Sequence, residues 1–348
     1  MTSANQNSTV LVTGGSGFIA VNCILKLLEQ GYKVKTTLRS MDRQNEVKSM
    51  LRNGGIRSFD ELSFIEADLV DDKNWNEAVA GCEFVLHVAS PTPILNYKHE
   101  DEMIIPAKEG VLRVLKASRD ANVSRVVLTS AYGAVGMGHL NRTTPYTEKD
   151  WSNLNANLHP YQKSKTIAER AAWDFIKIEG GNLELSTVNP VGVMGPVLGS
   201  DYSHSNQSIR RMLEGEIKAC PKLDSCYVDV RDVADLHLLA MTSPKAKGER
   251  FLASSGNALS MLDVANILRK NLGDAAHYVP SKEIPNWPIR LAALFNPSLR
   301  MVATLLGKYA EVSSEKAQKL LEWSPRSNEE AIVATAKSML QLGLIKSK

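Results

Sequence analysis

The chain has 348 residues, of which 43% are hydrophobic and 23% are charged, and its formal net charge is +3. This length predicts either one large domain or a main domain with a smaller partner, and the apolar fraction predicts a sizeable core. Because no basic block stands out in the sequence, we expect no nucleic-acid partner.

The first residues are polar, and no apolar run approaches the roughly 18 residues that are needed to cross a bilayer. We therefore expect no membrane contact and a cytoplasmic location. The spacing of the cysteines does not resemble a metal site, so we expect no metal ligands and reduced, mostly buried thiols at Cys23, Cys82, Cys220 and Cys226.

The first half of the chain alternates short β-branched runs with longer helical patterns. Strands are predicted at Thr9–Thr13, Val34–Leu38, Leu62–Glu66, Phe84–His87, Arg125–Thr129 and Leu183–Val188. Helices are predicted near Gly17–Gln30, Gln44–Arg52, Asn74–Ala80, Met103–Ala121 and Tyr161–Glu179. This order is typical of an α/β protein with a doubly wound parallel sheet, a Rossmann fold.

The regular alternation ends at Pro190, where segments rich in Gly, Pro and Ser begin. We expect residues 1–190 to form a dinucleotide-binding domain to which residues 226–243 return. Residues 191–225 and 244–348 are expected to form a smaller substrate-binding region, because irregular segments beyond the strand ends usually build the pocket of an α/β enzyme.

A glycine-rich segment follows the first predicted strand and opens the first predicted helix: Thr13-Gly14-Gly15-Ser16-Gly17-Phe18-Ile19-Ala20. Gly14 permits a tight turn, Gly17 lets the backbone approach a pyrophosphate, and the helix N-terminus offers amide donors. At this place in the chain the pattern predicts a dinucleotide site. Its contacts are expected from Thr13, Gly14, Ser16, Gly17, Phe18 and Ile19.

The end of the second predicted strand carries Arg39, where an NAD site usually has an acidic residue for the ribose 2′-hydroxyl. A guanidinium can pair with a 2′-phosphate, so this position predicts NADP(H), although Arg39 could be a solvated loop residue and Asp42 lies nearby. After the third strand, Asp68 could accept from the adenine amino group or cap the following helix. Leu69 is expected beside it at the cofactor.

Tyr161 and Lys165 lie four residues apart near the start of a predicted helix and therefore share a face. A phenol normally has a pKa near 10, and we expect the neighbouring ammonium, together with the positive nicotinamide of the oxidised cofactor, to lower it toward the working range. Ser130 ends the predicted strand Arg125–Thr129, so its hydroxyl is expected at the carboxyl edge of the sheet, where it could hold a substrate carbonyl oxygen.

These motifs resemble the extended short-chain dehydrogenase/reductase superfamily. Further segments resemble its branch of dihydroflavonol, cinnamoyl-CoA and aldehyde reductases: His87-Val88-Ala89-Ser90-Pro91, Glu148-Lys149-Asp150-Trp151 and Asn189-Pro190-Val191-Gly192. The resemblance implies an NADPH-dependent carbonyl reductase whose catalytic set is Ser130, Tyr161 and Lys165. It also implies that the cofactor is contacted by Val88, Ala89, Ser90, Tyr161, Lys165, Pro190 and Val193.

The sequence departs from that branch at one position. Members usually carry two adjacent serines after the strand, whereas this chain has Ser130-Ala131 followed by Tyr132. If the second position is the functional one, Thr129 or Tyr132 has to be considered in place of Ser130.

The expected reaction is reduction of an aldehyde or ketone to the alcohol, with hydride from NADPH and a proton from Tyr161. A nucleotide-sugar epimerase or dehydratase, a hydroxysteroid dehydrogenase and a non-catalytic NADP(H)-sensing regulator are the alternatives. We expect a small carbonyl substrate and a monomer or homodimer. The pocket wall is expected at Pro91–Ile94, His139–Leu158, Val193–Ser205 and Cys220–Cys226.

Overall fold

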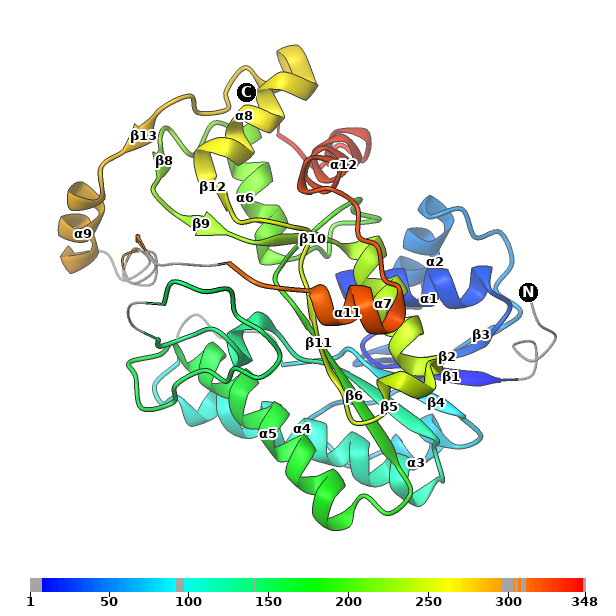
Figure 1. Cartoon of the computed structure of the whole chain (residues 1–348). Coiled ribbons are helices and arrows are strands. Elements are labelled where there is room, and N and C mark those ends of the chain that lie inside the picture. The colour runs from blue at the N-terminus through cyan, green and yellow to red at the C-terminus, as the bar shows by residue number, and fades with distance from the viewer. Residues whose placement is uncertain are drawn as a thin grey trace.

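A seven-stranded parallel sheet lies at the centre of the protein, in a computed structural model that describes residues 8–91, 97–139, 142–295, 299, 303, 306–307 and 311–346 (Figure 1). The strands follow the order β11-β6-β5-β4-β1-β2-β3 across the sheet. Their bounds are β1 (Thr9–Val12), β2 (Lys33–Leu38), β3 (Leu62–Glu66), β4 (Phe84–His87), β5 (Arg125–Thr129), β6 (Glu184–Pro190) and β11 (Arg250–Ala253). This architecture confirms the predicted doubly wound sheet.

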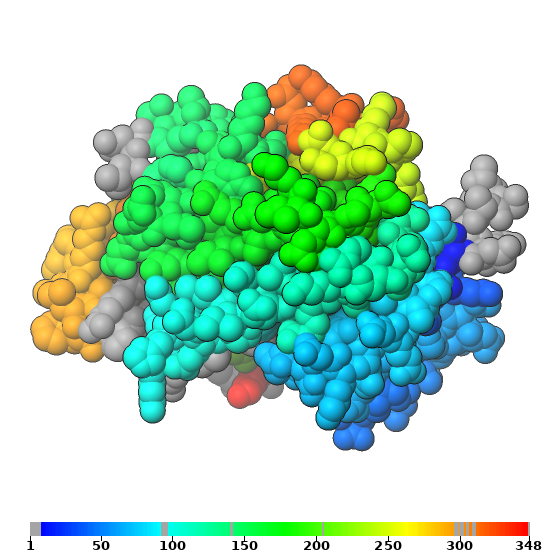
Figure 2. Space-filling model, turned by 90° about the horizontal axis from the view of Figure 1, so that it is seen from below, coloured from blue at the N-terminus to red at the C-terminus, as the bar shows by residue number. Residues whose placement is uncertain are grey.

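Helices cover both faces of the sheet, which is why its central strands can be apolar throughout. One face packs against α1 (Phe18–Glu29), α2 (Gln44–Asn53) and α7 (Val230–Thr242). The other face packs against α3 (Trp75–Val79), α4 (Asp101–Asp120) and α5 (Pro160–Glu179). Figure 2 shows the outside of this second face, where α4 and α5 lie side by side.

The smaller region stands over the carboxyl ends of the strands (Figure 1). Its elements are β7 (Gly192–Met194), α6 (His204–Leu213), β8 (Cys220–Pro221), β9 (Asp224–Ser225), β10 (Tyr227–Asp229), β12 (Leu259–Ser260), α8 (Met261–Leu272), β13 (Glu283–Ile284), α9 (Asn286–Phe295) and α12 (Asn328–Gln341). Helices α6, α8 and α12 share a core of their own. Short 3-10 turns complete the chain at η2 (Met41–Arg43), η3 (Tyr132–Ala134), η4 (Pro244–Ala246) and η5 (Gly273–Ala276).

The predicted division of the chain differs from the structure at two places within residues 244–348, which are predicted to belong to the substrate-binding region. Strand β11 pairs with β6 in the central sheet. Helix α11 (Glu315–Leu321) packs on the main body, since Ala317 and Leu321 join the core beneath α1 and α7. Within residues 226–243, α7 packs against α1, whereas β10 pairs with β7 in the smaller region.

In the part of the chain that the structure describes, no helix has both the length and the apolar character that a membrane span requires.

Candidate active site

The glycine-rich loop between β1 and α1 is shaped by contacts that leave no room for a side chain. Gly14 adopts a left-handed φ of 72°, and a Cβ there would lie 3.0 Å from the Cβ of Ala89. A Cβ on Gly15 would lie 2.2 Å from Thr36 Oγ1. The loop is therefore pressed against β2 and β4, at the point where the strand order reverses and ligands bind in such sheets.

The N-terminus of α1 presents free amide groups to this loop. Gly17 precedes the helix and offers no side-chain cap, and the first turn contains no acidic residue. Amide donors and the positive end of the helix dipole favour an anion here. The backbone from Gly14 to Ile19 thus fits the pyrophosphate of a dinucleotide.

Thr13 does not fit the prediction that it contacts the cofactor. The residue is fully buried, and its Oγ1 accepts from the backbone N–H of Ala89 at 2.9 Å and lies 2.9 Å from His87 Nδ1. The Thr13 hydroxyl therefore links the ends of β1 and β4, and this link supports the glycine-rich loop.

The end of β2 presents Arg39, whose side chain is exposed. Asp42 is drawn into the turn η2, where the Ser40 hydroxyl donates to its Oδ2 at 3.1 Å. Arg43 pairs with Glu46 through two nitrogens, at 2.7 and 2.9 Å, and with Asp201 at 2.9 Å. The charged group left to meet a ligand at the end of β2 is therefore the guanidinium of Arg39, which suits a 2′-phosphate.

Asp68 lies in a turn after β3. Its Oδ1 accepts from the backbone N–H of Val70 at 3.1 Å, whereas the residue that precedes α3 is Asn74. The alternative that Asp68 caps the following helix is thus wrong, and a role at the adenine stays a prediction.

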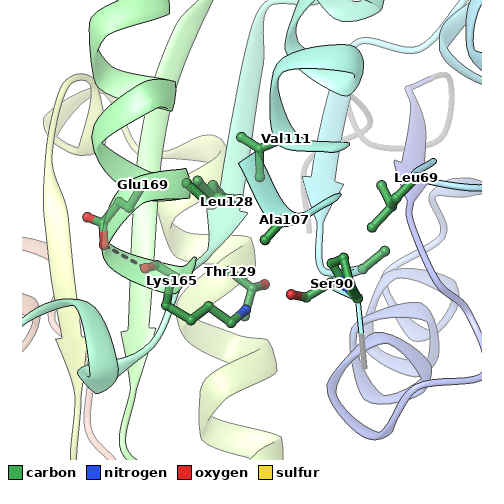
Figure 3. Close-up of a pocket in the computed structure, with 12 residues that line it drawn as sticks. Leu69, Ser90, Ala107, Val111, Leu128, Thr129, Lys165 and Glu169 are labelled. Atoms are coloured by element: carbon green, nitrogen blue, oxygen red, sulfur yellow. Dashed lines mark hydrogen bonds between the residues drawn. The ribbon is translucent and has the colours of Figure 1, made fainter. Parts of the chain in front are cut away.

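A pocket opens at the carboxyl ends of β4 and β5, between α4 and α5 (Figure 3). It brings together several predicted site residues, namely Leu69, Ala89, Ser90, Ser130 and Lys165. The rest of its wall is largely apolar: Pro91, Ala107, Val111, Leu128, Thr129, Ala168 and Glu169. Thr92, Pro93 and Ile94, like Leu140 and Asn141, were predicted for the pocket wall and lie outside the described residues. Val88 directly precedes the pocket residue Ala89 in the sequence and is half-buried. Pro190, the last residue of β6, and Val193, which follows in β7, are both buried.

Tyr161 lies in the first turn of α5, which the side chain of His159 caps. His159 Nδ1 accepts from the Tyr161 N–H at 3.2 Å, and the Gln162 side chain accepts from the His159 N–H at 3.3 Å. One helical turn on, Lys165 Nζ lies 5.9 Å from the centre of the Tyr161 ring. The structure thus places the two side chains on one face, as the spacing predicts.

Burial shifts the ionisation of both side chains of this pair. Burial raises the pKa of Tyr161, and burial lowers the pKa of Lys165 to about 8 in spite of the nearby Glu169 carboxylate. The cause of the shift at Tyr161 is the cost of desolvating a phenolate. That Lys165 and the positive nicotinamide of an oxidised cofactor together lower the phenol pKa stays a prediction.

The Ser130 hydroxyl is held by a buried carboxylate. It donates to Glu169 Oε2 at 2.5 Å, and both residues are buried. A hydroxyl has a single proton, and a neutral carbonyl oxygen is a weaker acceptor than a carboxylate. Ser130 lines the pocket, and its role in orienting a substrate carbonyl stays a prediction.

Thr129 is excluded from that role by a buried histidine. His237 Nδ1 lies 2.7 Å from the Val233 carbonyl oxygen, which can only accept, so Nδ1 carries the proton. Burial lowers the His237 pKa to about 4, so the neutral ring accepts at Nε2, where the Thr129 hydroxyl lies 2.7 Å away and donates. Tyr132, the remaining alternative, packs edge-on against Tyr146 with ring centres 5.7 Å apart.

The sequence does not predict a place in the site for Glu169, Arg250 or His237. Glu169 carried a signal, since it follows Lys165 by four residues and so lies on the same helical face. Arg250 and His237 come from distant parts of the chain, and no local pattern marked them.

A doubly wound sheet, a glycine loop at its switch point and a Tyr–Lys pair on one helix together define a dinucleotide-binding protein of the short-chain dehydrogenase/reductase class. Within that class, the chain belongs to the NAD dependent epimerase/dehydratase family, which it matches over residues 10–253.

Several known proteins resemble the chain over most of its length. It is 36% identical to cinnamoyl-CoA reductase 1 of Petunia hybrida over 276 residues, which cover 76% of this chain and 78% of that protein. It is 34% identical to an anthocyanidin reductase of Vitis vinifera over 278 residues, covering 75% and 80%. The structure of yeast methylglyoxal/isovaleraldehyde reductase Gre2 complexed with NADPH superimposes with a TM-score of 0.80 at 27% identity, covering 96% of this chain and 99% of that one. These relatives confirm the predicted resemblance.

Proposed function

We propose that the protein is an NADPH-dependent oxidoreductase that reduces an aldehyde or ketone to the alcohol. The observation that carries this proposal is the Tyr161–Lys165 pair, held on one face of α5 beside the pocket at the ends of β4 and β5. Arg39 at the end of β2 supports NADPH over NADH. The names of the relatives, which are reductases, support a carbonyl-type substrate.

The bound cofactor supplies the hydride, and the protein supplies position and a proton. The backbone from Gly14 to Ile19 would hold the pyrophosphate of the cofactor. Ala89 and Ser90 line the pocket at the ends of β4 and β5, whose wall around Val111 and Leu128 is largely apolar.

The Tyr161 phenol gives its proton to the alcohol oxygen that forms on the substrate. Because burial raises its pKa, the phenol is fully protonated at neutral pH, which suits a donor in the direction of reduction. Lys165, with its pKa near 8, remains mostly an ammonium at pH 7 and stabilises the phenolate that the transfer leaves behind. Ser130 is not part of this proton path.

The first test is Tyr161→Phe. We expect turnover to fall by about 10²- to 10⁴-fold, because the substitution removes the general acid, while the dissociation constant for NADPH stays within about twofold. NADPH oxidation against a panel of aldehydes, ketones and keto esters measures the first quantity, and nucleotide fluorescence measures the second. Tyr32→Phe, a buried tyrosine at the start of β2, is the matched control.

Retention of turnover by Tyr161→Phe would refute the proton-donor assignment. A wild-type protein that binds NADPH but turns over nothing in the panel would favour a sensor of NADP(H). A purified protein that carries tightly bound NAD would favour an epimerase or dehydratase.

A further inference from the structure

Glu169 is a carboxylate buried deep behind the pocket, with 1% of its surface exposed. It lies on α5, one turn after Lys165. Both of its oxygens are held by neighbours on other elements. Oε2 accepts from Ser130 Oγ at 2.5 Å and from Asn189 Nδ2 at 2.7 Å. Oε1 accepts from Arg250 Nε at 2.6 Å, and Thr187 Oγ1 lies 3.3 Å from it.

These partners tie α5 to neighbouring strands of the sheet. Ser130 follows β5, Thr187 and Asn189 belong to β6, and Arg250 opens β11. A buried ion pair is stabilised when further hydrogen bonds satisfy its remaining groups. Both oxygens of Glu169 have such bonds, whereas Nη2 of Arg250 is buried without a partner among the described residues. These contacts hold α5, which also carries Tyr161 and Lys165, against the sheet at Glu169.

Arg250 extends the same cluster to the surface loops. Its Nη1 donates to the carbonyl oxygens of Glu148 at 2.6 Å and Asp150 at 2.9 Å, and its guanidinium lies 3.8 Å from the ring centre of Trp151. The sequence motif from Glu148 to Trp151 is thereby docked against the same ion pair that anchors the catalytic helix.

Glu169 follows Lys165 by one helical turn on α5, and both residues line the same pocket. The titratable groups around Lys165 are Tyr161 and Glu169 on α5 and His87 on β4, with Arg250 on β11 behind Glu169. Burial lowers the pKa of His87 to about 3, so His87 is neutral and adds no charge at working pH. Among these groups, the attraction that opposes the desolvation of the Lys165 ammonium comes from Glu169.

We infer that Glu169 is a positioning residue, which holds α5 through Arg250, Asn189 and Ser130 and supplies a buried negative charge one helical turn from Lys165. Ser130 acts through Glu169 and makes no direct contact with the substrate. The catalytic role of Glu169 and its hydrogen-bond partners rests on the proposed function, whereas the effect of Glu169 on the ionisation of Lys165 does not.

The decisive experiment measures the ionisation of Lys165 without cofactor or substrate. The protein is treated with trace acetic anhydride over a series of pH values, and acetylation of the Lys165 peptide is followed by mass spectrometry. Glu169→Gln keeps the shape of the side chain and removes its charge, so we expect the midpoint pH of Lys165 acetylation to fall by about one unit. In Glu169→Asp, the charge stays, and the midpoint is expected within about 0.3 of wild type. An unchanged midpoint in Glu169→Gln overturns the inference.

A second pair of variants tests Ser130 and remains informative if Glu169→Gln fails to fold. Ser130→Ala and Thr187→Val each remove one hydroxyl from the Glu169 cluster and leave the carboxylate in place. We expect each to lower kcat by less than about tenfold, with KM for the carbonyl unchanged and the Lys165 midpoint no lower than in wild type. A loss in Ser130→Ala of more than about 100-fold, with Thr187→Val near wild type, would show that Ser130 contacts the substrate.

The two proposals fail in different ways. If the wild-type protein reduces no carbonyl, the proposed function falls, but the acetylation midpoints still report on Glu169 and Lys165. If the midpoints do not move while Tyr161→Phe abolishes turnover, the proposed function stands and the role of Glu169 falls.

Discussion

A hydroxyl proton goes to the strongest acceptor within reach, and at the end of β5 those acceptors are already in place. Glu169 takes the proton of Ser130, and the neutral ring of His237 takes that of Thr129. Both acceptors are buried, so water does not compete with them. The partners of the two hydroxyls at this strand end, those of Ser130 and Thr129, therefore lie 39 and 108 positions later in the chain, respectively.

At the end of β2, the exposed guanidinium of Arg39 is free to meet a ligand phosphate without first breaking a buried contact. For Arg39→Ala we expect the affinity for NADPH to fall by about 10- to 100-fold, the value of one or two charge-assisted hydrogen bonds, and the affinity for NADH to stay within about twofold. Fluorescence titration with both nucleotides measures the ratio. Arg57→Ala, another exposed arginine, is the control, and an equal loss for NADPH and NADH would contradict the 2′-phosphate role.

The loop between β1 and α1 depends on Gly15 for the close approach of two strands. For Gly15→Ala, whose new methyl group would meet the Thr36 side chain, we expect the free energy of unfolding to fall by about 1–3 kcal/mol. Gly133→Ala is the control, since its Cβ would meet nothing closer than 3.9 Å and its backbone is not left-handed. Denaturant unfolding compares them, and equal stability of the two variants would contradict the packing argument.

Elements built from local patterns were predictable, and those that depend on distant partners were not. The strands from β1 to β6 and the helices from α1 to α5 lie within about two residues of their predicted bounds, because each has an apolar run of the right length and period. Strand β11 was not predicted because it lies beyond the point where the regular alternation of strands and helices ends, and its place is set by pairing with β6.

The same distinction between local patterns and distant partners applies to the candidate active site. The spacing of Tyr161 and Lys165 along one helix predicts that they share a face, and a glycine loop at a βα junction predicts its own geometry. The direction of the Ser130 hydroxyl and the rise in the Tyr161 pKa depend on burial and on Glu169, which no local sequence pattern reports.

At the scale of the whole molecule, two fully buried histidines link stability to pH. Burial lowers the pKa of His87 to about 3 and that of His237 to about 4, whereas in the unfolded chain both lie near about 6.5. Below about pH 6.5, both histidines take up protons in the unfolded state but remain neutral in the folded state. Stability should therefore be steady between about pH 6.5 and about pH 7.5 and fall as the pH drops toward about 4, by up to about 1.4 kcal/mol per pH unit for each histidine.

Denaturant unfolding at a series of pH values from about 7.5 to about 4.5 measures this slope. His237→Gln should lose the share of one histidine, whereas His277→Gln, at an exposed position, should keep the wild-type slope. A free energy of unfolding that stays flat through this range would contradict the assignment of neutral buried rings.

Strand β11 is synthesised after the other strands of the central sheet, so the sheet is completed late during synthesis on the ribosome. Arg250 is synthesised 81 residues after Glu169, which at about 5–20 residues per second takes roughly 4–16 seconds. During that interval the nascent sheet ends at β6, and the carboxylate beside its open edge lacks its counter-ion. Docking of β11 then brings Arg250 to this carboxylate and covers the edge of β6. A nascent chain released at Pro190 is therefore an incomplete folding unit, although it holds the whole glycine loop and both Tyr161 and Lys165.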